Sequence, residues 1–540
     1  MKISVKNNNS KNAIILAAGF GMRMVPINLN TPKAFLTVNG EKLIERVIKQ
    51  LHEVGIYEIH IVVGFMKEKF EYLIDKYGVD LIVNPQYASH NNISSLALAS
   101  NYIRNTYIIP SDVWCKKNPF CAKESNSWYM ISDAIDANSN IKIGSNNRLI
   151  YTNHGIGNKM IGISYLCGNI AEIVKKRILI FNNNVKYNNL FWEEALYNDL
   201  DVKTCFLINA KVIPHAEISE INTYEQLREL DSHSNELHST AMETIADVFQ
   251  IQPKNIINIS VLKKGMTNRS FIFQLKRDGN VGSSKYIMRV PGEGTDKLIN
   301  RQQEATVYQT ISGKGLCDDP IYLNPRNGYK ITKFLEESRT CNPNDDRDLK
   351  RCIILLHSFH DMGLKVEHTF DIFEKIRFYK SLWGDSKSRY SDHCITTENI
   401  FKLKNYIDSQ HKQWCLTHID AVPDNFLFYK NSNSSDGQDE LLQLTDWEYS
   451  GMQDPHVDIA MFCLYAMYDK KQVDYLIDLY FQGNCLPAVR TKIYCYIAIC
   501  GLLWSNWCEF KMKQGVEFGE YSLRQYQFAK AYYRYAIERM

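Results

Sequence analysis

The chain has 540 residues, of which 45% are hydrophobic and 23% charged, so we expect a globular protein with more than one domain and not a disordered chain. Its 63 basic and 60 acidic residues give a net charge of +3, a balance that argues against nucleic acid and anionic membranes as partners. The 14 cysteines form no CxxC pair, and neither a secretion signal nor a membrane-length apolar run is found, which predicts a cytoplasmic protein with reduced thiols.

Short apolar runs and amphipathic stretches alternate over the first 230 residues. In chain order, the pattern predicts strands at 13–17, 58–63, 81–84 and 106–110, and helices at 42–54, 67–76 and 94–103. Alternation of this kind is typical of a mostly parallel sheet that is covered by helices. We therefore predict a Rossmann-like α/β domain over residues 1–230.

The pattern changes after residue 230. Residues 231–238 are polar and carry no apolar periodicity, so they are predicted to form a linker. A short helix and consecutive strands follow, at 239–250, 257–263, 270–276 and 286–289, and helical periodicity dominates later. A small β lobe over 239–340 and a larger helical lobe over 341–540 indicate an α+β, protein-kinase-like bilobal domain.

A glycine-rich turn follows the first predicted strand, in Leu16-Ala-Ala-Gly-Phe-Gly-Met-Arg23. The glycines let backbone N–H groups approach phosphate oxygens, and Arg23 and Lys33 add positive charge nearby. A lone glycine turn is weak evidence, but here the turn, the arginine and a Pro-Lys pair occur in order within one loop. The loop residues predicted to contact a nucleotide are Leu16, Ala17, Ala18, Gly19 and Gly21.

This loop resembles the LxxGxGxR…PK signature of the nucleotidyltransferases that make sugar- and alcohol-nucleotides. The resemblance implies that the loop holds a triphosphate and that Arg23 and Lys33 act on the transferring phosphoryl group. It also implies that Asp112 binds a metal. Asp112 follows the strand predicted at 106–110, and open α/β sheets bind ligands beyond the carboxyl ends of their strands.

Residues 12–230 resemble one branch of this family, the bacterial phosphocholine cytidylyltransferases, through stretches such as Asn91–Leu96 and Phe191–Glu193. The resemblance implies that Asn91 and Ser94 lie near the nucleotide base. It further implies a choline pocket walled by Trp128, Tyr165 and Trp192. A quaternary ammonium has no N–H to donate, so ring faces bind it by cation–π attraction. Core packing is the alternative for Tyr165 and Trp192.

Two departures from the branch leave its second metal ligand open. The branch usually has Asp-x-Asp where this chain has Pro110-Ser-Asp112, and Glu-Ile-Asp where it has Glu217-Ile-Ser219. Glu217 is the predicted second metal carboxylate, with Glu220 and Glu193 as alternatives.

A second motif is His418-Ile-Asp420-Ala-Val-Pro-Asp-Asn425, followed by Thr445-Asp446-Trp-Glu448. Phosphoryl transfer needs a carboxylate near the substrate hydroxyl and ligands for Mg²⁺ on the nucleotide phosphates. The HxDxxxxN…D spacing predicts Asp420 for the first role and Asn425 and Asp446 for the second.

Residues 240–540 resemble the choline/ethanolamine and aminoglycoside kinase group, which has the protein-kinase-like fold. By this resemblance Thr267 and Asn268 lie in the nucleotide-binding turn. Arg289 takes the place of the strand lysine of protein kinases, and Glu304 is its partner on a helix. An exposed ion pair of little weight is the alternative for Arg289 and Glu304.

Residues 446–451 and 501–505 favour the bacterial choline kinases within this group. The resemblance implies a choline pocket lined by Trp504 and Tyr521, with the carboxylates of Asp420 and Glu448 beside the ammonium. The family often has a second tryptophan where this chain has Gly501. Trp507, one turn after Trp504, is either its substitute or a core residue.

The two halves together imply a bifunctional enzyme. It would phosphorylate choline with ATP and then transfer CMP from CTP to phosphocholine, with Mg²⁺ in both sites. Its partners are then small molecules, and the sequence does not address the oligomeric state. Two alternatives stay open: ethanolamine or another amino-alcohol as substrate, and an active kinase fused to a degenerate N-terminal nucleotide-binding module.

Overall fold

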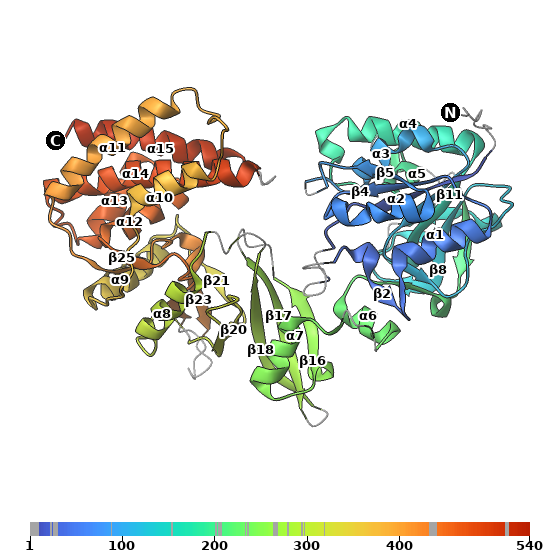
Figure 1. The fold of residues 1–540 in the computed structure, drawn as a ribbon, viewed down its shortest axis with the longest axis horizontal. Coiled ribbons are helices and arrows are strands. Elements are labelled where there is room, and N and C mark those ends of the chain that lie inside the picture. The colour runs from blue at the N-terminus through green and yellow to red at the C-terminus, as the bar shows by residue number, and fades with distance from the viewer. Residues whose placement is uncertain are drawn as a thin grey trace. The chain divides into compact units, whose positions relative to one another are not determined.

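The computed structural model of the chain divides into two compact units, residues 1–263 with 270–282 and residues 264–269 with 283–540 (Figure 1). Each unit is described by itself. The structure describes residues 10–21, 24, 31–87, 89–152, 155–199, 202–203, 208–232, 234, 237–262, 268–277, 280–292, 295, 298–317, 319–430, 440–513 and 518–540.

The first unit is built on a seven-stranded sheet with the strand order β14-β8-β11-β6-β1-β4-β5. β1 pairs in parallel with β4 and β6, β4 with β5, and β14 with β8, whereas β11 is antiparallel to β6 and β8. The predicted mostly parallel α/β sheet is thereby confirmed. The strands are β1 (Asn12–Ala17), β4 (Ile59–Val63), β5 (Asp80–Val83), β6 (Thr106–Pro110), β8 (Trp128–Asp136), β11 (Gly157–Leu166) and β14 (Asn209–Ile213).

Helices cover both faces of this sheet because successive side chains of a strand point to opposite sides. Ala13 and Ile15 of β1 belong to a core with α1 (Leu43–Glu53) and α2 (Tyr72–Tyr77). Ile14 belongs to a second core with residues of two other helices. Those helices are α3 (Asn92–Leu98) and α4 (Gly168–Asn182).

The described part of this unit also contains short strand pairs and helices outside the seven-stranded sheet. Four two-stranded pairs are present: β2 (Thr37–Val38) with β3 (Glu41–Lys42), β7 (Val113–Cys115) with β15 (Ile218–Glu220), β9 (Ile141–Ile143) with β10 (Leu149–Tyr151), and β12 (Asn198–Asp199) with β13 (Val202–Lys203). The unit also contains α5 (Glu194–Tyr197), α6 (Tyr224–Leu230), α7 (Thr240–Phe249), β16 (Ile256–Val261) and most of β17 (Asn268–Arg277). The pairing of β7 with β15 brings the segment after Glu220 next to Asp112.

The predicted linker at 231–238 is held against the first unit where it is described. Asn39 N donates to Asp231 Oδ2 at 2.7 Å, and Ser234 Oγ donates to the carbonyl of Thr37 at 2.8 Å. Tyr224 Oη donates to the carbonyl of Leu237 at 2.8 Å. These contacts order the segment, while the domain limits at 230 and 239 stay a prediction.

The second unit combines a small β region with a larger helical one, as the predicted bilobal fold requires. β18 (Asn280–Pro291) is antiparallel to β20 (Lys330–Lys333), which pairs with β19 (Tyr322–Leu323), and α8 (Arg301–Ile311) lies between these strands in sequence. Two small antiparallel sheets follow. They are formed by β21 (Arg339–Thr340), β23 (Phe426–Lys430) and β24 (Glu440–Leu444), and by β22 (Cys415–Thr417) and β25 (Gly451–Gln453).

Seven helices form the rest of the described part of this unit: α9 (Asp346–Asp361), α10 (Ile372–Ser381), α11 (His393–Ser409), α12 (His456–Tyr465), α13 (Lys470–Tyr480), α14 (Pro487–Lys513) and α15 (Glu520–Ile537). They share one hydrophobic core, in which α14 is buried along most of its length. Within the described residues, no helix combines the length and the apolar character needed to cross a membrane.

Candidate active sites

A cavity of about 280 Å³ lies in the first unit, at the carboxyl ends of β1 and β6. Most of the predicted nucleotide-contacting residues line it: Leu16, Ala17, Ala18, Gly19, Gly21 and Asn91. Gly21 has a φ of +65°, and a Cβ there would lie 3.3 Å from Cδ of Lys33, so this position favours glycine and lets the lysine stem pass closely. Arg23 lies outside the described residues.

Lys33 is a charged residue that lines this cavity. Its Nζ donates to Asp112 Oδ2 and, at 2.5 Å, to Asn222 Oδ1. Asn222 in turn donates from Nδ2 to Glu220 Oε1 at 2.6 Å. The structure therefore brings the predicted Lys33 and Asp112 together and adds Asn222, which the sequence analysis missed.

Strand pairing explains how Asn222 reaches Asp112 across 110 positions. Glu220 at the end of β15 pairs with Val113 at the start of β7, and Ile221 N donates to the carbonyl of Asp112 at 2.9 Å. The sequence offered one signal for Asn222: it is a polar residue directly before Thr223, whose side chain caps α6. Glu217, the predicted second metal ligand, lies at the other end of β15 and accepts from Lys117 Nζ at 2.6 Å.

The predicted aromatic walls separate in the structure. Trp192 lines the cavity. Trp128 and Tyr165 are buried in the core on the other face of the sheet, beside Tyr107. Lys211 Nζ lies 4.1 Å from the ring centroid of Trp128, so an internal ammonium already covers this ring.

Two further predicted residues of this half lie near each other. Asn91 lines the cavity and caps α3 by accepting from Asn92 N at 2.8 Å. Ser94 is buried beneath it: its Oγ donates to the carbonyl of Asn91 at 2.9 Å and accepts from Asn84 Nδ2 at 3.2 Å. Ser94 thus supports the segment that carries Asn91.

Glu193, an alternative metal carboxylate in the sequence analysis, is a buried acid at the cavity wall. Its Oε1 accepts from Tyr129 Oη at 3.3 Å, and among the described residues Oε2 has no hydrogen-bond partner. Burial raises the pKa of Glu193 to about 7. Such a carboxyl group destabilises the fold where it is ionised and suits a site that receives a positive charge.

Replacing Glu193 by Gln is expected to stabilise the first unit at alkaline pH. The folded-state pKa of about 7 exceeds the ordinary pKa of 4.5 for a glutamate, so wild-type stability falls as pH rises between these values. Glutamine removes this dependence, and the variant gains up to about 3 kcal/mol at pH 8 and almost nothing at pH 4.5. Urea unfolding at both pH values measures the difference. Glu217→Gln is the control, and an equal effect of Glu193→Gln at both pH values would contradict the assignment.

In the second unit, the HxDxxxxN loop folds back on itself. Asn425 Nδ2 donates to the carbonyl of Asp420 at 2.8 Å and to Asp420 Oδ2 at 3.1 Å. Thr445 N donates to the carbonyl of Asn425 at 2.9 Å, which brings the following Asp446 to the loop. The predicted trio of Asp420, Asn425 and Asp446 is thereby assembled from two segments.

This loop contains a strained backbone that Asp458 holds in place. Ile419 has a φ of +70°, which a β-branched residue rarely adopts. Asp458 accepts from His418 N at 2.9 Å and from Ile419 N at 2.7 Å, and His360 Nε2 lies 2.9 Å from its Oδ2. The strain therefore fixes the direction in which Asp420 leaves the loop.

The acids of this site destabilise one another. Burial, followed by the charges of Asp446 and Glu448, raises the pKa of Asp420 to about 8. Among the described residues, no three His, Cys, Asp or Glu side chains are grouped as a metal site. Asp446 and Asn425 nevertheless offer hard oxygen donors of the kind that Mg²⁺ uses together with substrate phosphates, so the donor set fits Mg²⁺.

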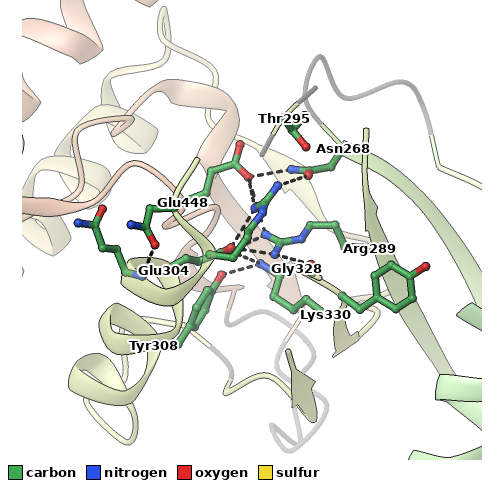
Figure 2. A network of polar contacts seen from close by, with 12 residues as sticks. Asn268, Arg289, Thr295, Glu304, Tyr308, Gly328, Lys330 and Glu448 are labelled. Atoms are coloured by element: carbon green, nitrogen blue, oxygen red, sulfur yellow. Dashed lines mark hydrogen bonds and ion pairs between the residues drawn. The ribbon is translucent and has the colours of Figure 1, made fainter. Parts of the chain in front are cut away.

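Arg289 and Glu304 form a buried ion pair in the β region of this unit (Figure 2). Arg289 donates to both carboxylate oxygens, at 2.9 Å for Nη2 to Oε2, and Nη2 also donates to the carbonyl of Gly328. Burial opposes the ionisation of Glu304, but Arg289 outweighs it and lowers the pKa of Glu304 to about 2. Burial rules out the exposed surface pair that was the alternative. Thr267 lies outside the described residues.

Glu448 lies in the same network. Its Oε2 accepts from Asn268 Nδ2 at 2.9 Å and from Arg301 Nη1 at 3.1 Å. Figure 2 shows Asn268 and Glu448 pointing toward each other. Arg301 was not predicted, because its three partners come from separate parts of the chain.

Aromatic rings form a continuous chain near Asp420. Ring centroids lie 5.8 Å apart for Trp504 and Tyr449, 6.5 Å for Trp504 and Tyr379, and 5.5 Å for Trp504 and Trp507. Phe518 links Trp507, at 5.4 Å, to the predicted Tyr521, at 6.4 Å.

The charge of Asp420 reaches this aromatic chain. After burial, Asp420 is the next cause that raises the pKa of Tyr379, and it contributes to the raised pKa values of Tyr449 and Tyr521. The charge of Glu448 also contributes to the raised pKa values of Tyr379 and Tyr449. In the described part of the chain, Tyr379 Oη, Tyr449 Oη and Trp507 Nε1 are buried without hydrogen-bond partners. Tyr379 and Tyr449 are further residues that the sequence analysis missed, although Tyr449 directly follows its Asp-Trp-Glu motif.

Gly501 stands where the choline kinases often have a second tryptophan, and the structure gives the reason for the glycine. A Cβ at this position would lie 2.8 Å from the carbonyl oxygen of Gln525 and 2.9 Å from Ala529 N. Helices α14 and α15 therefore pack too closely here for any side chain. Trp507 joins the aromatic chain from the following turn.

Two family models match the chain. Residues 13–115 match the MobA-like NTP transferase domain, and residues 259–480 match choline/ethanolamine kinase.

Curated relatives divide in the same way. The choline-phosphate cytidylyltransferase of Streptococcus pneumoniae is 32% identical over 227 residues, which cover 41% of this chain and 99% of that protein. The 2-aminoethylphosphonate cytidylyltransferase of Lancefieldella rimae is 30% identical and covers 42% and 95%. Protein LicA of Haemophilus influenzae is 28% identical over 273 residues, covering 48% and 96%.

The N-terminal relative is matched over nearly its whole length, and the C-terminal model is matched around the Asp420 loop. The chain therefore belongs to the choline-phosphate cytidylyltransferase family of nucleotidyltransferases in its N-terminal part, and a kinase domain that matches choline/ethanolamine kinase follows it, so that it is a nucleotidyltransferase and a kinase in one enzyme.

Proposed function

We propose that this enzyme phosphorylates choline with ATP and then transfers CMP from CTP to the phosphocholine formed. The observation that carries the proposal is the aromatic chain around Asp420, because a catalytic-loop carboxylate beside ring faces suits a hydroxyl on a quaternary ammonium. The boundaries proposed for the two domains are 1–230 and 239–540, and the location proposed is the cytoplasm.

In the proposed kinase step, Asp420 accepts the proton of the choline hydroxyl as its oxygen attacks the γ-phosphate of ATP and ADP leaves. Trp504 and Tyr521 hold the ammonium by their ring faces, with Tyr379 and Tyr449 as further walls. Asn425 and Asp446 would hold Mg²⁺, which would neutralise phosphate charge. Arg289, fixed by Glu304, adds positive charge on the nucleotide side.

In the proposed transferase step, an oxygen of phosphocholine attacks the α-phosphate of CTP, and pyrophosphate leaves. The backbone from Leu16 to Gly21 and the Lys33 ammonium hold the triphosphate, and Arg23 is assigned to the same group. Asp112 and Asn222 present oxygens that fit Mg²⁺, which supplies charge neutralisation when bound. Asn222 supports this assignment better than Glu217 does, because its oxygen shares Lys33 with Asp112.

A coupled assay tests the whole proposal. Purified protein receives ATP, CTP and Mg²⁺ with choline or ethanolamine, and ADP, pyrophosphate and CDP-alcohol are followed. We expect CDP-choline with both by-products and a higher kcat/KM for choline. ADP without pyrophosphate would mean that the N-terminal unit is a binding module, and absence of both products would refute the proposal.

The Lancefieldella relative makes an aminophosphonate a second candidate for the transferase site. A phosphonate already carries its phosphorus on carbon, so the fused kinase would have no part in making it, and this favours a phosphate ester. Adding 2-aminoethylphosphonate with CTP and Mg²⁺ but no ATP tests this candidate. Pyrophosphate release at a rate comparable to that with phosphocholine would support it.

A further inference from the structure

Glu304, Glu448 and Asn268, which Figure 2 labels, also contact a second buried arginine, Arg301. Arg301, the first residue of α8, is 8% exposed. Its Nη1 donates to Glu304 Oε2 at 2.9 Å and to Glu448 Oε2 at 3.1 Å, and its Nη2 lies 3.2 Å from Asn268 Oδ1. Asn268 Nδ2 donates to the same Glu448 oxygen at 2.9 Å. Arg301, Asn268 and Glu448 therefore form a closed triangle, called the clamp below.

The clamp joins three segments that the proposed kinase site uses. Asn268 belongs to the predicted nucleotide-binding turn. Glu448 lies two residues after Asp446, and Asp446 has a φ of +66°, which sets the path of this segment. Arg301 lies one turn before Glu304 on α8. A change at the clamp is thus transmitted to the nucleotide side of the site.

The surroundings of Arg301 hold it in one position. A Cβ at Gly328 would lie 2.7 Å from Nε and 2.9 Å from Cδ of Arg301, so the stem runs tightly over this glycine. Glu448 is buried, and its Oε2 accepts from both Asn268 and Arg301. A fixed, buried guanidinium therefore meets a buried carboxylate, and removing either partner leaves the other charge unpaired.

We propose that Arg301 and Glu448 are positioning residues of the kinase site, which hold the Asp446 segment against Asn268 for the binding of ATP and Mg²⁺. This inference rests on the proposed kinase function and assigns Glu448 to the nucleotide side instead of the choline pocket. Arg301 acts through Glu448 and Asn268 and touches no reacting atom in this scheme.

The test compares Arg301→Gln, Glu448→Gln and the double variant in the full chain. Calorimetry measures the Kd of ADP with Mg²⁺, and kinetics measures the KM values of ATP and choline. Each single change removes charge-assisted hydrogen bonds and is expected to raise the ADP Kd and the ATP KM about tenfold to a hundredfold. The KM of choline stays within about twofold, and the double variant is no worse than the worse single variant, since both break one clamp.

Two variants separate positioning from a general loss of stability. Arg301→Lys keeps the charge without the planar fork and recovers part of the ADP affinity. Lys492→Gln breaks another buried pair of this unit, Lys492 with Asp454 at 2.7 Å, and lowers Tm while the ADP Kd stays unchanged. If the Gln single variants do not fold, the double variant, which leaves no unpaired charge between Arg301 and Glu448, is measured with Arg301→Lys.

Two outcomes would overturn the clamp. One is a choline KM that rises in Glu448→Gln but not in Arg301→Gln. The other is an unchanged ADP Kd in folded Arg301 variants. A wild-type protein that binds ADP with Mg²⁺ but phosphorylates no amino-alcohol would instead refute the proposed function, and the ADP measurement would still decide the clamp.

Discussion

Asp420→Asn is expected to lower the rate of choline phosphorylation about a thousandfold and to leave CMP transfer to added phosphocholine unchanged. Removing a positioned general base typically lowers a rate by a factor of about 10² to 10⁴. Asp420 is a carboxylate of the catalytic loop, and its charge acts on Tyr379 and Tyr521 of the aromatic chain. ADP release from choline and ATP, and pyrophosphate release from phosphocholine and CTP, are measured separately.

The same substitution is expected to stabilise the second unit in the absence of Mg²⁺ and nucleotide. The folded-state pKa of Asp420 is about 8, whereas the ordinary pKa of an aspartate is 3.8, so its ionisation opposes folding increasingly as pH rises between these values. The advantage of the Asn variant grows by about 1.4 kcal/mol per pH unit in this window. Thermal unfolding at pH 5 and pH 8 measures it.

Asp424→Asn is the matched control for both effects, because Asp424 is an exposed residue of the same loop. It should keep kinase activity and show no stabilisation. An Asp420→Asn variant that retains a tenth or more of the kinase rate would contradict the base assignment. Loss of both reactions in that variant would contradict two separate sites.

Parts of each site were predictable because their residues are neighbours in sequence. The turn at Gly19 and Gly21 and the lysine at 33 belong to one loop, and Asn425 follows Asp420 by five positions. Local spacing fixes such groups once the flanking strand is recognised. The strand at Thr106–Pro110 was predicted with the same limits that the structure has, and it placed Asp112 at the cavity.

The remaining site residues depend on packing between distant segments. Tyr379 comes from α10, about forty positions before Asp420, and helical periodicity alone does not distinguish it from a core residue. Trp128 shows a different difficulty, which is the alternation of side chains between the two faces of a sheet. Its neighbour Tyr129 faces the core that contains Trp192, and a strand turns adjacent residues to opposite faces. A motif match whose alignment is uncertain by one residue therefore does not determine on which face of the sheet an aromatic ring lies.

Lys33→Ala is expected to lower CMP transfer about a hundredfold to a thousandfold while choline phosphorylation continues at the wild-type rate. Lys33 lines the cavity, and its ammonium is held by Asp112 and Asn222, so it can meet a triphosphate bound there. Removing one preorganised donor from such a site costs about this much. Pyrophosphate release from phosphocholine and CTP is the measurement.

Lys33→Met tests whether the charge or the stem of Lys33 is responsible, because methionine keeps the packing against Gly21 without the ammonium. Both variants should lose CMP transfer equally if the charge acts on the triphosphate. Lys117→Ala is the control: it breaks the exposed pair with Glu217, whose carboxylate the sequence had favoured as a metal ligand, and it should leave the rate unchanged. A strong loss of CMP transfer in Lys117→Ala, together with a mild loss in Lys33→Met, would contradict the assignment. The triphosphate would then bind near the Lys117–Glu217 pair and not in the cavity, because only in that case would this pair support the reaction.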